Sequence, residues 1–568
     1  MIVGIDLGTT NSAIGLWGAH GAELIPNRMG DTLTPSAVSI SDGGEVLVGL
    51  AARERQSTHP ERTATAFKRY MGTKQTCRLG GQTYSAEDLS ALVLRSLKAD
   101  AEAWLGEPVE QAVITVPAYF NDRQRKATRR AGELAGLKVE RLVNEPTAAA
   151  LAYGIHQLDE EQPFLVFDLG GGTFDVSIVE ITDGIIEVRA SAGDNRLGGE
   201  DFNDLLVQIA RPSLNLACDP DDARAGRLEE LLRAAAERTR RRLSDSDRAE
   251  FSIVWEGKLL STEIEAAEFE ERARPLVDRL REPVLRALRD SRIRAEELSE
   301  VLLVGGATRM PIVRRAVTRM FGRFPSARLE PERSVALGAA VQAGLKAKDA
   351  ALKEVRLTDV CPFTLGIGIV ENDRKGGTRD GIFSPIIERN TVLPASRVET
   401  YWNVYEGQRQ IDVAIYQGES RQVTGNVKLG EIKVPVPAGP VGSVTLECRF
   451  SYDSSGLLEV DVTVPKTGAV HQLVIVDDPE AATEAELAER RQRLAALKFH
   501  PRDDAPNVAA LARAERCFEM FLGDRRDHIN HMLTAFRNVL DAQDPDRIEV
   551  ARAELLASLD ELEGERFL

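Results

Sequence analysis

The sequence predicts a multidomain chain in which an α/β part is followed by an all-β part and a helical tail. Its 568 residues are too many for one hydrophobic core, so about two to four domains are expected. Strand-like and helix-like segments mix up to about residue 350, strict apolar alternation dominates 360–466, and amphipathic helical patterns follow. The chain therefore changes its architecture twice.

The α/β part is recognised from short apolar runs that end in turns and from helical periodicity between them. Strands are expected at 2–8 and 112–117, as a pair around a glycine turn within 164–181, and at the start of 301–311; helices are expected at 124–136 and 227–243.

One long-period repeat lies inside this part. GIDLGTTNSAIGLW at 4–17 and VFDLGGGTFDVSIV at 166–179 share a strand, an aspartate, a glycine turn and a second strand, with Asp6 and Asp168 at matching positions. A repeat of one element at this distance indicates two similar half-domains that face each other across a cleft.

The two turns have the composition of a phosphate site. Backbone N–H groups in a turn form an anion-binding concavity that glycine lets a ligand approach, and Thr9, Thr10 and Thr173 add hydroxyl groups. A carboxylate beside a phosphate is repulsive unless a divalent cation lies between them, so Asp6 and Asp168 imply magnesium held through water. One such turn could be an ordinary hairpin, whereas two matching copies favour phosphate. No GxxxxGK[ST] loop is present.

The remaining segments predict a linker, a β domain and helices. KAKDAALKE at 346–354 is polar and helical, and 355–360 is short and extended. VTLECRF at 444–450 and LLEVDVTV at 457–464 alternate strictly and form a hairpin. The tail helices are expected at 483–497, 506–523, 526–541 and 544–560.

Composition excludes several classes of protein. The apolar fraction is 43% and the charged fraction 28%, as in ordinary globular proteins, and the net charge of -17 argues against nucleic-acid binding. The five cysteines are scattered, so no metal knuckle or redox pair is expected. No signal peptide or membrane span is recognised, and we expect a cytoplasmic protein that binds neither nucleic acid nor membrane.

Six motifs give the chain a resemblance to the seventy-kilodalton heat-shock (DnaK-type) chaperone family. They are IDLGTTNS, AVITVPAYFND, LVNEPTAAALAYG, DLGGGTFDVS, LGGEDFN and VGGATRMP, in the family's order and spacing, and weaker matches continue through TDVCPFTLGI, ERNTVLPAS and YQGES. The resemblance implies an actin-like (ribonuclease-H-like) two-lobed ATPase, a β-sandwich peptide-binding domain and a short helical lid. The expected boundaries are 1–354, a linker at 355–360, 361–480 and 481–568.

The resemblance also implies roles at the cleft. Catalytic roles fall on Asp6, Lys68, Glu145, Asp168, Thr173 and Asp175, with Lys68 contacting the γ-phosphate and the attacking water, and with Asp6, Glu145 and Asp168 around magnesium and potassium. The nucleotide contacts implied are Gly8, Thr9, Thr10, Asn11, Gly170, Gly171, Gly172, Thr173, Gly198, Gly199, Glu237, Arg240, Arg241, Ser244, Gly305, Gly306 and Arg309. Glu332 stands where the family has an aspartate near the monovalent ion.

Simpler interpretations exist for some of these residues. Lys68 could be a solvated helix lysine. Glu145 precedes Pro146, and its role could be limited to capping the helix that begins there. Residues 238–242 could be an exposed basic face. Two arginines that stack on adenine are nevertheless a plausible base clamp.

In the β domain the resemblance implies a groove for extended apolar peptides. The lining residues would be Ile367, Ile369, Val370, Tyr401, Val404, Ile411 and Val413, although the same row could be sandwich core. Val370 and Val404 replace a methionine and an alanine of the family, and Tyr401, Trp402 and Tyr405 crowd the region. We expect a narrower groove with a different selectivity.

The linker and tail depart from the family as well. The usual leucine run is replaced by Val355, Arg356, Leu357, Thr358 and Asp359, which predicts weaker coupling between ATP and peptide. The tail is shorter than the usual lid and resembles the specialised bacterial HscC-type branch. Arg141 and Asp359 match residues that couple a J-domain cochaperone to the linker, although Arg141 could form an ordinary surface ion pair.

The function implied is that of an ATP-dependent chaperone of protein folding and the stress response. It would hydrolyse ATP to ADP and phosphate to control its hold on unfolded or specific client chains, with a J-domain cochaperone. The alternatives are a sugar kinase on the same ATPase fold, an adaptor that uses nucleotide only as a switch, and an actin-type filament former. A kinase would leave residues 360–568 unexplained, and the attached β domain disfavours a filament former. The presence of Lys68, Thr173 and Asp175 argues against an adaptor that does not hydrolyse ATP.

Overall fold

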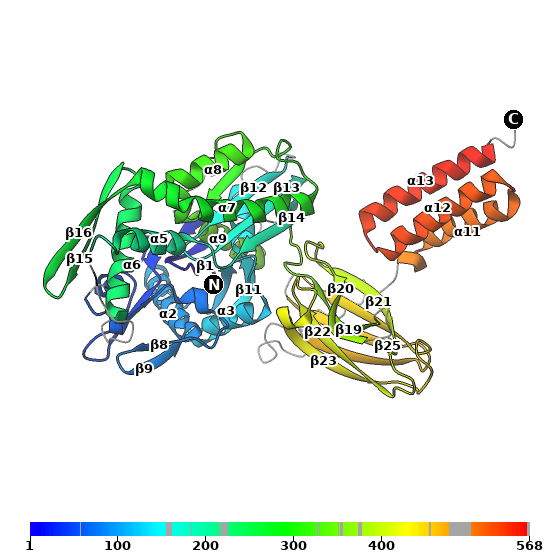
Figure 1. Cartoon of the computed structure of the whole chain (residues 1–568), viewed down its shortest axis with the longest axis horizontal. Helices are drawn as coiled ribbons and strands as arrows, with labels where there is room; N and C mark the ends of the chain where they lie inside the picture. Colours follow the sequence, from blue (N-terminus) through cyan, green and yellow to red (C-terminus); the bar gives the residue numbers. More distant parts are fainter. Residues whose placement is uncertain are drawn as a thin grey trace.

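The computed structural model describes most of the chain, as three successive parts (Figure 1). The described residues are 1–56, 58–154, 162–182, 185–214, 216, 225–326, 328, 330–349, 352, 356–372, 378–453, 456–475 and 501–564. Within these ranges no helix is long and apolar enough to cross a membrane. The expected helix at 483–497 and the linker residue Val355 lie outside the described residues.

Two sheets with the same strand pattern organise the N-terminal part. In the first sheet, β1 pairs in parallel with β10 and antiparallel with β2. In the second sheet, β12 pairs in parallel with β17 and antiparallel with β13. The strand orders are β11-β10-β1-β2-β3 and β17-β12-β13-β14-β18. The first contains β1 (Ile2–Asp6), β2 (Asn11–Gly18), β3 (Gly21–Leu24), β10 (Gln111–Val116) and β11 (Lys138–Asn144), with β4 (Thr34–Pro35) on β2. The second contains β12 (Phe164–Leu169), β13 (Phe174–Thr182), β14 (Ile185–Asp194), β17 (Val301–Val304) and β18 (Arg356–Thr358). The predicted internal repeat is confirmed.

Smaller elements surround these sheets. On the first-sheet side they are β5 (Ala37–Ile40), β6 (Val46–Val48), β7 (Thr63–Thr65), β8 (Thr76–Leu79), β9 (Gln82–Ser85), α1 (Leu50–Arg55), α2 (Ala86–Leu105) and α3 (Asp122–Leu134). On the second-sheet side they are α5 (Gly199–Ala210), α6 (Ala225–Arg242), β15 (Arg248–Trp255), β16 (Lys258–Glu265), α7 (Ala266–Ser291) and α8 (Pro311–Phe321). Short 3₁₀ turns lie at η1 (Pro60–Arg62), η2 (Phe67–Tyr70) and η3 (Gly306–Arg309).

Two buried helices join the two sheets. Every residue of α4 (Glu145–Gly154) is buried, and α9 (Ser334–Lys346) is buried along most of its length, so neither shows a polar outer face. A helix that is apolar all round belongs inside a core. The two helices cross where Gly338 meets Ala148: a Cβ at Gly338 would lie 1.7 Å from the Ala148 carbonyl oxygen. Only glycine permits this backbone contact.

The second part is a β-sandwich. One sheet has the order β20-β19-β22-β23 and the other β21-β24-β25-β26. Their strands are β19 (Leu365–Asn372), β20 (Thr378–Ile387), β21 (Ala395–Trp402), β22 (Gln410–Gln417), β23 (Val427–Pro435), β24 (Thr445–Tyr452), β25 (Leu458–Val464) and β26 (Ala469–Ile475), with the 3₁₀ turn η5 (Val423–Gly425). The inward side chains of both sheets form one core. The predicted β24–β25 hairpin is confirmed.

The third part is a bundle of α11 (Ala505–Met520), α12 (Asp524–Asp541) and α13 (Pro545–Gly564), preceded by η6 (Pro501–Asp503). Its apolar stripes bury Cys517, Phe536 and Leu559 in a core of its own, separate from the sandwich core. Figure 1 shows this helical tail beyond the sandwich, away from the N-terminal part. Three of the four predicted tail helices are confirmed.

The α4–α9 crossing leads to a stability prediction. Gly338→Ala should lower the free energy of unfolding by about 2–3 kcal/mol, because the new methyl group must push the helices apart. Gly226→Ala on α6 is the matched control, since nothing lies within 4 Å of a Cβ there, and it should be neutral or stabilising by up to ~1 kcal/mol. Scanning calorimetry measures both, and equal stability of the two variants would contradict the close crossing.

Candidate functional site

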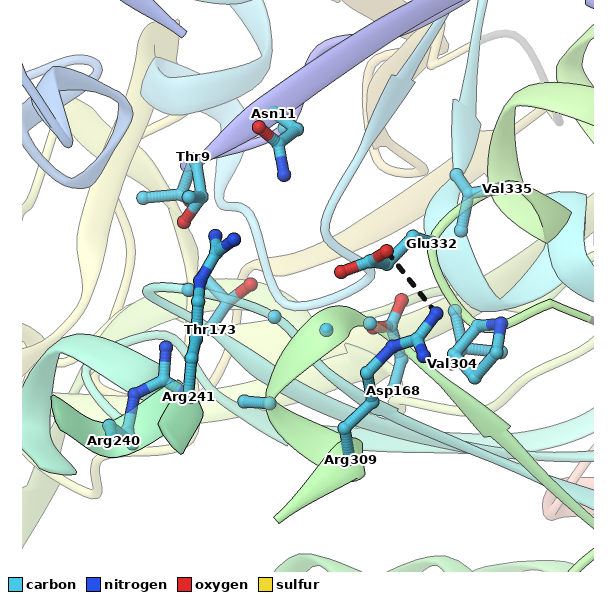
Figure 2. A pocket seen from close by; sticks show the side chains of 18 of the residues that line it. Thr9, Asn11, Asp168, Thr173, Arg240, Arg241, Val304, Arg309, Glu332 and Val335 are labelled. Atoms are coloured by element: carbon cyan, nitrogen blue, oxygen red, sulfur yellow. Dashed lines mark hydrogen bonds and ion pairs between the residues drawn. The ribbon is translucent and has the colours of Figure 1, made fainter. Parts of the chain in front are cut away.

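A cavity of about 850 Å³ opens between the two glycine turns. Side chains from both halves of the N-terminal part point into it (Figure 2). The predicted residues that line it are Asp6, Gly8, Thr9, Thr10, Asn11, Lys68, Glu145, Asp168, Gly170, Gly171, Thr173, Glu237, Arg240, Arg241, Ser244, Gly305, Gly306 and Arg309. The two strand-end turns and the predicted base clamp therefore share one cavity.

The second turn packs closely against the Thr10 side chain of the first turn and against Gly198 behind it. A Cβ at Gly171 would lie 2.1 Å from Thr10 Oγ1, and a Cβ at Gly198 would lie 2.5 Å from the Gly172 nitrogen. Gly172 of the second turn does not line the cavity, and neither do Gly198 and Gly199, which pack behind that turn, where the Gly199 N–H donates to the Gly170 carbonyl at 3.0 Å. These glycines shape the turn from behind.

Asp6, Glu145, Asp168 and Lys68 line the floor of the cavity, and the Asp175 carboxylate lies close to them without lining it. Lys68 Nζ donates to Glu145 Oε1 at 2.6 Å, and the lysine side chain is only 3% exposed. Asp6 ends β1, while Asp168 and Asp175 are directly paired on β12 and β13. The simple interpretation of Lys68 as a solvated helix lysine is therefore wrong.

Burial dominates the electrostatics of this cluster. Burial, and then the neighbouring Glu145 carboxylate, raises the pKa of Asp6 to about 7 and that of Asp175 to about 8. The same causes raise the pKa of Asp168 well above its usual range, and Lys68 opposes all three shifts. Asp168 Oδ2 is buried and has no hydrogen-bond partner within the described part of the chain. The cluster thus lacks positive charge.

This donor set fits a divalent cation. Hard cations prefer oxygen ligands, and a buried carboxylate oxygen without a partner is a free acceptor for a bound cation or its water. Across the described ranges, no three or more Asp, Glu, His or Cys side chains converge closely enough to hold a metal directly.

The opposite end of the cavity is cationic. Arg240 and Arg241 extend from the end of α6, and Arg309 approaches from η3 beside Glu332 (Figure 2). Arg240 Nε donates to Asn203 at 2.9 Å, which fixes its plane, and Arg241 pairs with Glu237 at 2.6 Å. Burial lowers the pKa of Arg240. Planar guanidinium groups held in this way suit stacking on an aromatic base.

Several lining residues were missed by sequence reasoning. Asp245, Arg314 and Arg315 also line the cavity. The two arginines follow VGGATRMP in the first turns of α8, and their closeness in the chain to Arg309 was the available signal. Arg315 pairs with Glu270 of α7, which the sequence pattern does not indicate.

Two contacts join the two sides of the cavity. Arg69, beside Lys68 on η2, pairs with Asp201 of α5 at 3.3 Å. Gln56, next to α1, donates to Glu230 of α6 at 3.1 Å. Neither contact was predicted, because each joins residues more than a hundred positions apart.

The linker adds a strand to the second sheet. β18 pairs in parallel with β14, and Leu357 packs against the core that contains α4. Asp359 is buried and accepts from Asn144 Nδ2 at 3.1 Å, while Asn144 accepts from Arg125 at 2.5 Å. Arg141 lies in the same region: burial lowers its pKa, and the Asp359 carboxylate raises it. Arg141 is half-buried, so both the coupling role and an ordinary surface ion pair stay predictions for it.

A second set of contacts ties the sandwich to α7. Arg389 donates to Asp290 at 2.8 and 3.3 Å, and Asn390 Nδ2 donates to the same carboxylate at 2.9 Å. Arg389 also donates to Glu419 at 2.7 Å. The Asn390 side chain in turn accepts from the Ser191 N–H of β14 at 2.9 Å. Charge-assisted bonds of this kind hold the sandwich against the second sheet.

Tyr119 connects this interface to the cavity floor. Its backbone N–H donates to Asp175 at 3.2 Å, its ring lies 4.5 Å from the Phe363 ring of the sandwich, and its hydroxyl accepts from Arg286 at 3.0 Å. One residue therefore contacts the carboxylate cluster on one side and the sandwich on the other.

The predicted groove residues occupy two environments. Ile367 and Val413 are 3% exposed and lie inside the sandwich core. The other five are partly exposed: Ile369, Val370, Tyr401, Val404 and Ile411. Core packing accounts for Ile367 and Val413, and the remaining five stay candidates for a lining.

Comparison with known proteins places the chain among chaperones. The family described as "Hsp70 protein" matches residues 2–78 and 73–562. The chain is 41% identical over 485 residues to "Chaperone protein DnaK" of Thermotoga neapolitana, which covers 84% of this chain and 80% of the relative. The proteins of the same name from Thermotoga petrophila and Thermotoga maritima are each 40% identical over the same length and the same shares.

The buried ion pair leads to a prediction. Lys68→Met should lower the free energy of unfolding by about 3 kcal/mol, because it leaves Glu145 buried without its partner. Lys68→Met with Glu145→Gln should recover most of the loss. The exposed Lys74→Met is the control and should stay within ~0.5 kcal/mol. Calorimetry in EDTA without nucleotide measures all four proteins, and a Lys68→Met loss as small as that of the control would contradict the pairing.

Proposed function

The chain belongs to the Hsp70 family and is an ATP-dependent chaperone, and we propose that its carboxylate cluster hydrolyses ATP while Tyr119 and the linker transmit the state of the cleft to the sandwich. The observation that carries this proposal is the continuous contact from Asp175 through Tyr119 to Phe363. ATP hydrolysis in this family controls the hold on client polypeptides. The roles of individual residues given below belong to the proposal.

Magnesium is the cation that fits the floor of the cleft. Asp6, Glu145 and Asp168 would hold it, mostly through water, and bound there it would neutralise charge on the phosphates. Potassium would occupy a neighbouring position near Glu332. The buried, partnerless Asp168 Oδ2 and the raised pKa of Asp6 support this assignment.

The residues of the chain then perform the remaining work of phosphoryl transfer. The N–H groups of the two glycine turns and the hydroxyls of Thr9, Thr10 and Thr173 cradle the phosphates. Lys68 places a positive charge beside the γ-phosphate, and Thr173 and Asp175 orient the attacking water. Orientation and charge stabilisation suffice for this reaction, which needs no covalent intermediate with the protein.

Asp175 can take up the proton that the attacking water releases while its carboxyl is ionised. Burial raises the pKa of Asp175 and so opposes ionisation. Lys68 favours the ionised form.

The adenosine end is assigned to Arg240, Arg241 and Arg309, with Glu237 and Ser244 toward the ribose.

We assign the actin-like ATPase domain to 1–354, the linker to 355–360, the β-sandwich substrate domain to 361–480 and the helical lid to 481–568. The two repeated sheets, the separate sandwich core and the separate core of the helical tail support these boundaries. Placement in the HscC-type branch is part of the same proposal. A cytoplasmic location agrees with the scattered cysteines, four of which are free in the described residues.

A J-domain cochaperone is the partner proposed to stimulate hydrolysis. Arg141 and Asp359 would contact or respond to it, and the buried network of Asp359, Asn144 and Arg125 offers a route from that surface to the linker. The clients would be extended apolar segments of unfolded or specific proteins. Ile369, Val370, Tyr401, Val404 and Ile411 are the proposed groove lining.

The hydroxyl of Thr173 yields a kinetic prediction. Thr173→Val should lower the turnover number about a hundredfold, the equivalent of ~2.7 kcal/mol of transition-state stabilisation, while ATP still binds. Steady-state phosphate release with and without a J-domain protein and an apolar peptide measures this. The unchanged protein should be stimulated by both additions. Full activity of Thr173→Val would refute the assigned role, and no response to either addition would refute the chaperone coupling.

The contact of Asp290 with the sandwich yields a coupling prediction. Asp290→Asn should reduce the acceleration of peptide release by ATP about tenfold or more, because it weakens three hydrogen bonds from the sandwich to one carboxylate. Asp278→Asn, an exposed aspartate on the same helix, is the control. Stopped-flow release of a fluorescent peptide measures the rates. Equal acceleration in both variants, with equal ATP binding, would contradict a role for this contact in coupling.

A further inference from the structure

Strand β21 is the open edge of its sheet. It pairs with β24 on one side, and within the described residues no strand pairs with its other side. Backbone groups of an antiparallel strand point alternately to the two sides, so Val398, Thr400 and Trp402 present their N–H and C=O groups to the same side. An open edge of this kind is a template for adding another extended chain.

The helical tail closes this edge at one residue. Gln543, in the turn between α12 and α13, accepts from the Val398 N–H at 3.3 Å and donates its Nε2 to the Val398 carbonyl at 2.8 Å. A side-chain amide that pairs with both backbone groups of one residue reproduces the pairing of an added strand. The described part of the chain contains no corresponding partner on the open side of Thr400 or Trp402.

Two further observations show that this contact is a formed site. Gln543 is 4% exposed, and its backbone has a φ of 53°, a left-handed conformation that few residues other than glycine adopt. Asp544 attracts Arg397, the neighbour of Val398, although Asp541 and Glu399 repel each other across the same contact. The turn is therefore directed at this strand by its backbone shape and by the amide.

We propose that Gln543 is an edge clamp that competes with long client segments for strand β21, so that the docked tail limits how far an extended chain can run along the edge. This inference rests on the proposed chaperone function. It names the residue through which the helical tail regulates the client site.

The geometry sets the length at which exclusion begins. Beyond the clamp, the free edge from Glu399 to Trp402 is four residues, or about 13 Å of extended chain, which leaves room for a segment of about four to five residues. Trp402 and Tyr405, 57% and 54% exposed, offer aromatic surface at that free end, so an apolar segment is the favoured occupant. A longer segment that runs toward Ala395 meets Gln543 at Val398.

The test uses the full chain, its Gln543→Glu variant and Glu549→Gln as the control. Gln543→Glu keeps the shape of the side chain but sets a carboxylate oxygen against the Val398 carbonyl, whereas Glu549 is exposed on α13. Affinities are measured by fluorescence anisotropy for labelled leucine-rich peptides of about five and about twelve residues. Hydrogen exchange of the Val398 amide, read by mass spectrometry, reports the clamp directly.

Gln543→Glu is expected to speed hydrogen exchange at the Val398 amide and to raise the affinity for the long peptide about fivefold or more. Its affinity for the short peptide should match that of the unchanged chain. An equal gain in affinity for both peptides, or an unchanged affinity for the long one, would contradict the claim that the clamp excludes long segments from the β21 edge. Unchanged exchange at Val398 would overturn the clamp itself. If none of the three proteins bound either peptide, both the proposed function and the exclusion of long segments would be contradicted. Hydrogen exchange at Val398 does not depend on peptide binding, so it would still show whether the clamp forms.

Discussion

The excess of buried negative charge at the cleft floor is the constraint on which the rest of the molecule depends. Asp6, Glu145, Asp168 and Asp175 surround a single lysine, and ionised carboxyls taken out of water are costly unless cations compensate them. Lys68 compensates one charge. The remaining charge favours the binding of a cation and its nucleotide between the two sheets.

The same constraint explains how the cleft reaches the sandwich. Asp175 belongs to the cluster and accepts from Tyr119, whose ring packs on Phe363. The linker strand β18 extends the sheet that holds Asp168, and the buried helices α4 and α9 cross at Gly338 without space to slide freely. These contacts are the route by which we propose that a change of charge at the floor reaches the sandwich. The polar linker is expected to weaken the coupling between ATP and peptide. The hydrogen bonds of Arg389 and Asn390 to Asp290 form a second connection between the two parts.

The sequence predicted the repeat of β1–β2 in β12–β13, because a strand, an aspartate and a glycine turn form a local pattern. It also predicted the β24–β25 hairpin and three tail helices, again from local periodicity. Lys68 and Glu145 could be assigned only through the family resemblance, since nothing local distinguishes a catalytic lysine from a solvated one. The contacts of Asp290 with Arg389 and of Gln543 with Val398 join residues 99 and 145 positions apart, and no periodicity records such pairs. Burial also separates Ile367 and Val413, which lie in the sandwich core, from the other predicted groove residues. Alternation in the sequence cannot make this distinction, because core and lining positions follow the same pattern.

The most direct test of this account is the affinity of the chain for ADP with and without magnesium, measured by titration calorimetry. If the carboxylate cluster requires a divalent cation to accept phosphates, removing magnesium with EDTA should weaken ADP binding about a hundredfold, or by ~2.7 kcal/mol. Asp168→Asn should reduce that dependence, because it removes one of the charges that the cation offsets. Equal affinity for ADP in magnesium and in EDTA would contradict the claim that the buried negative charge governs the cleft.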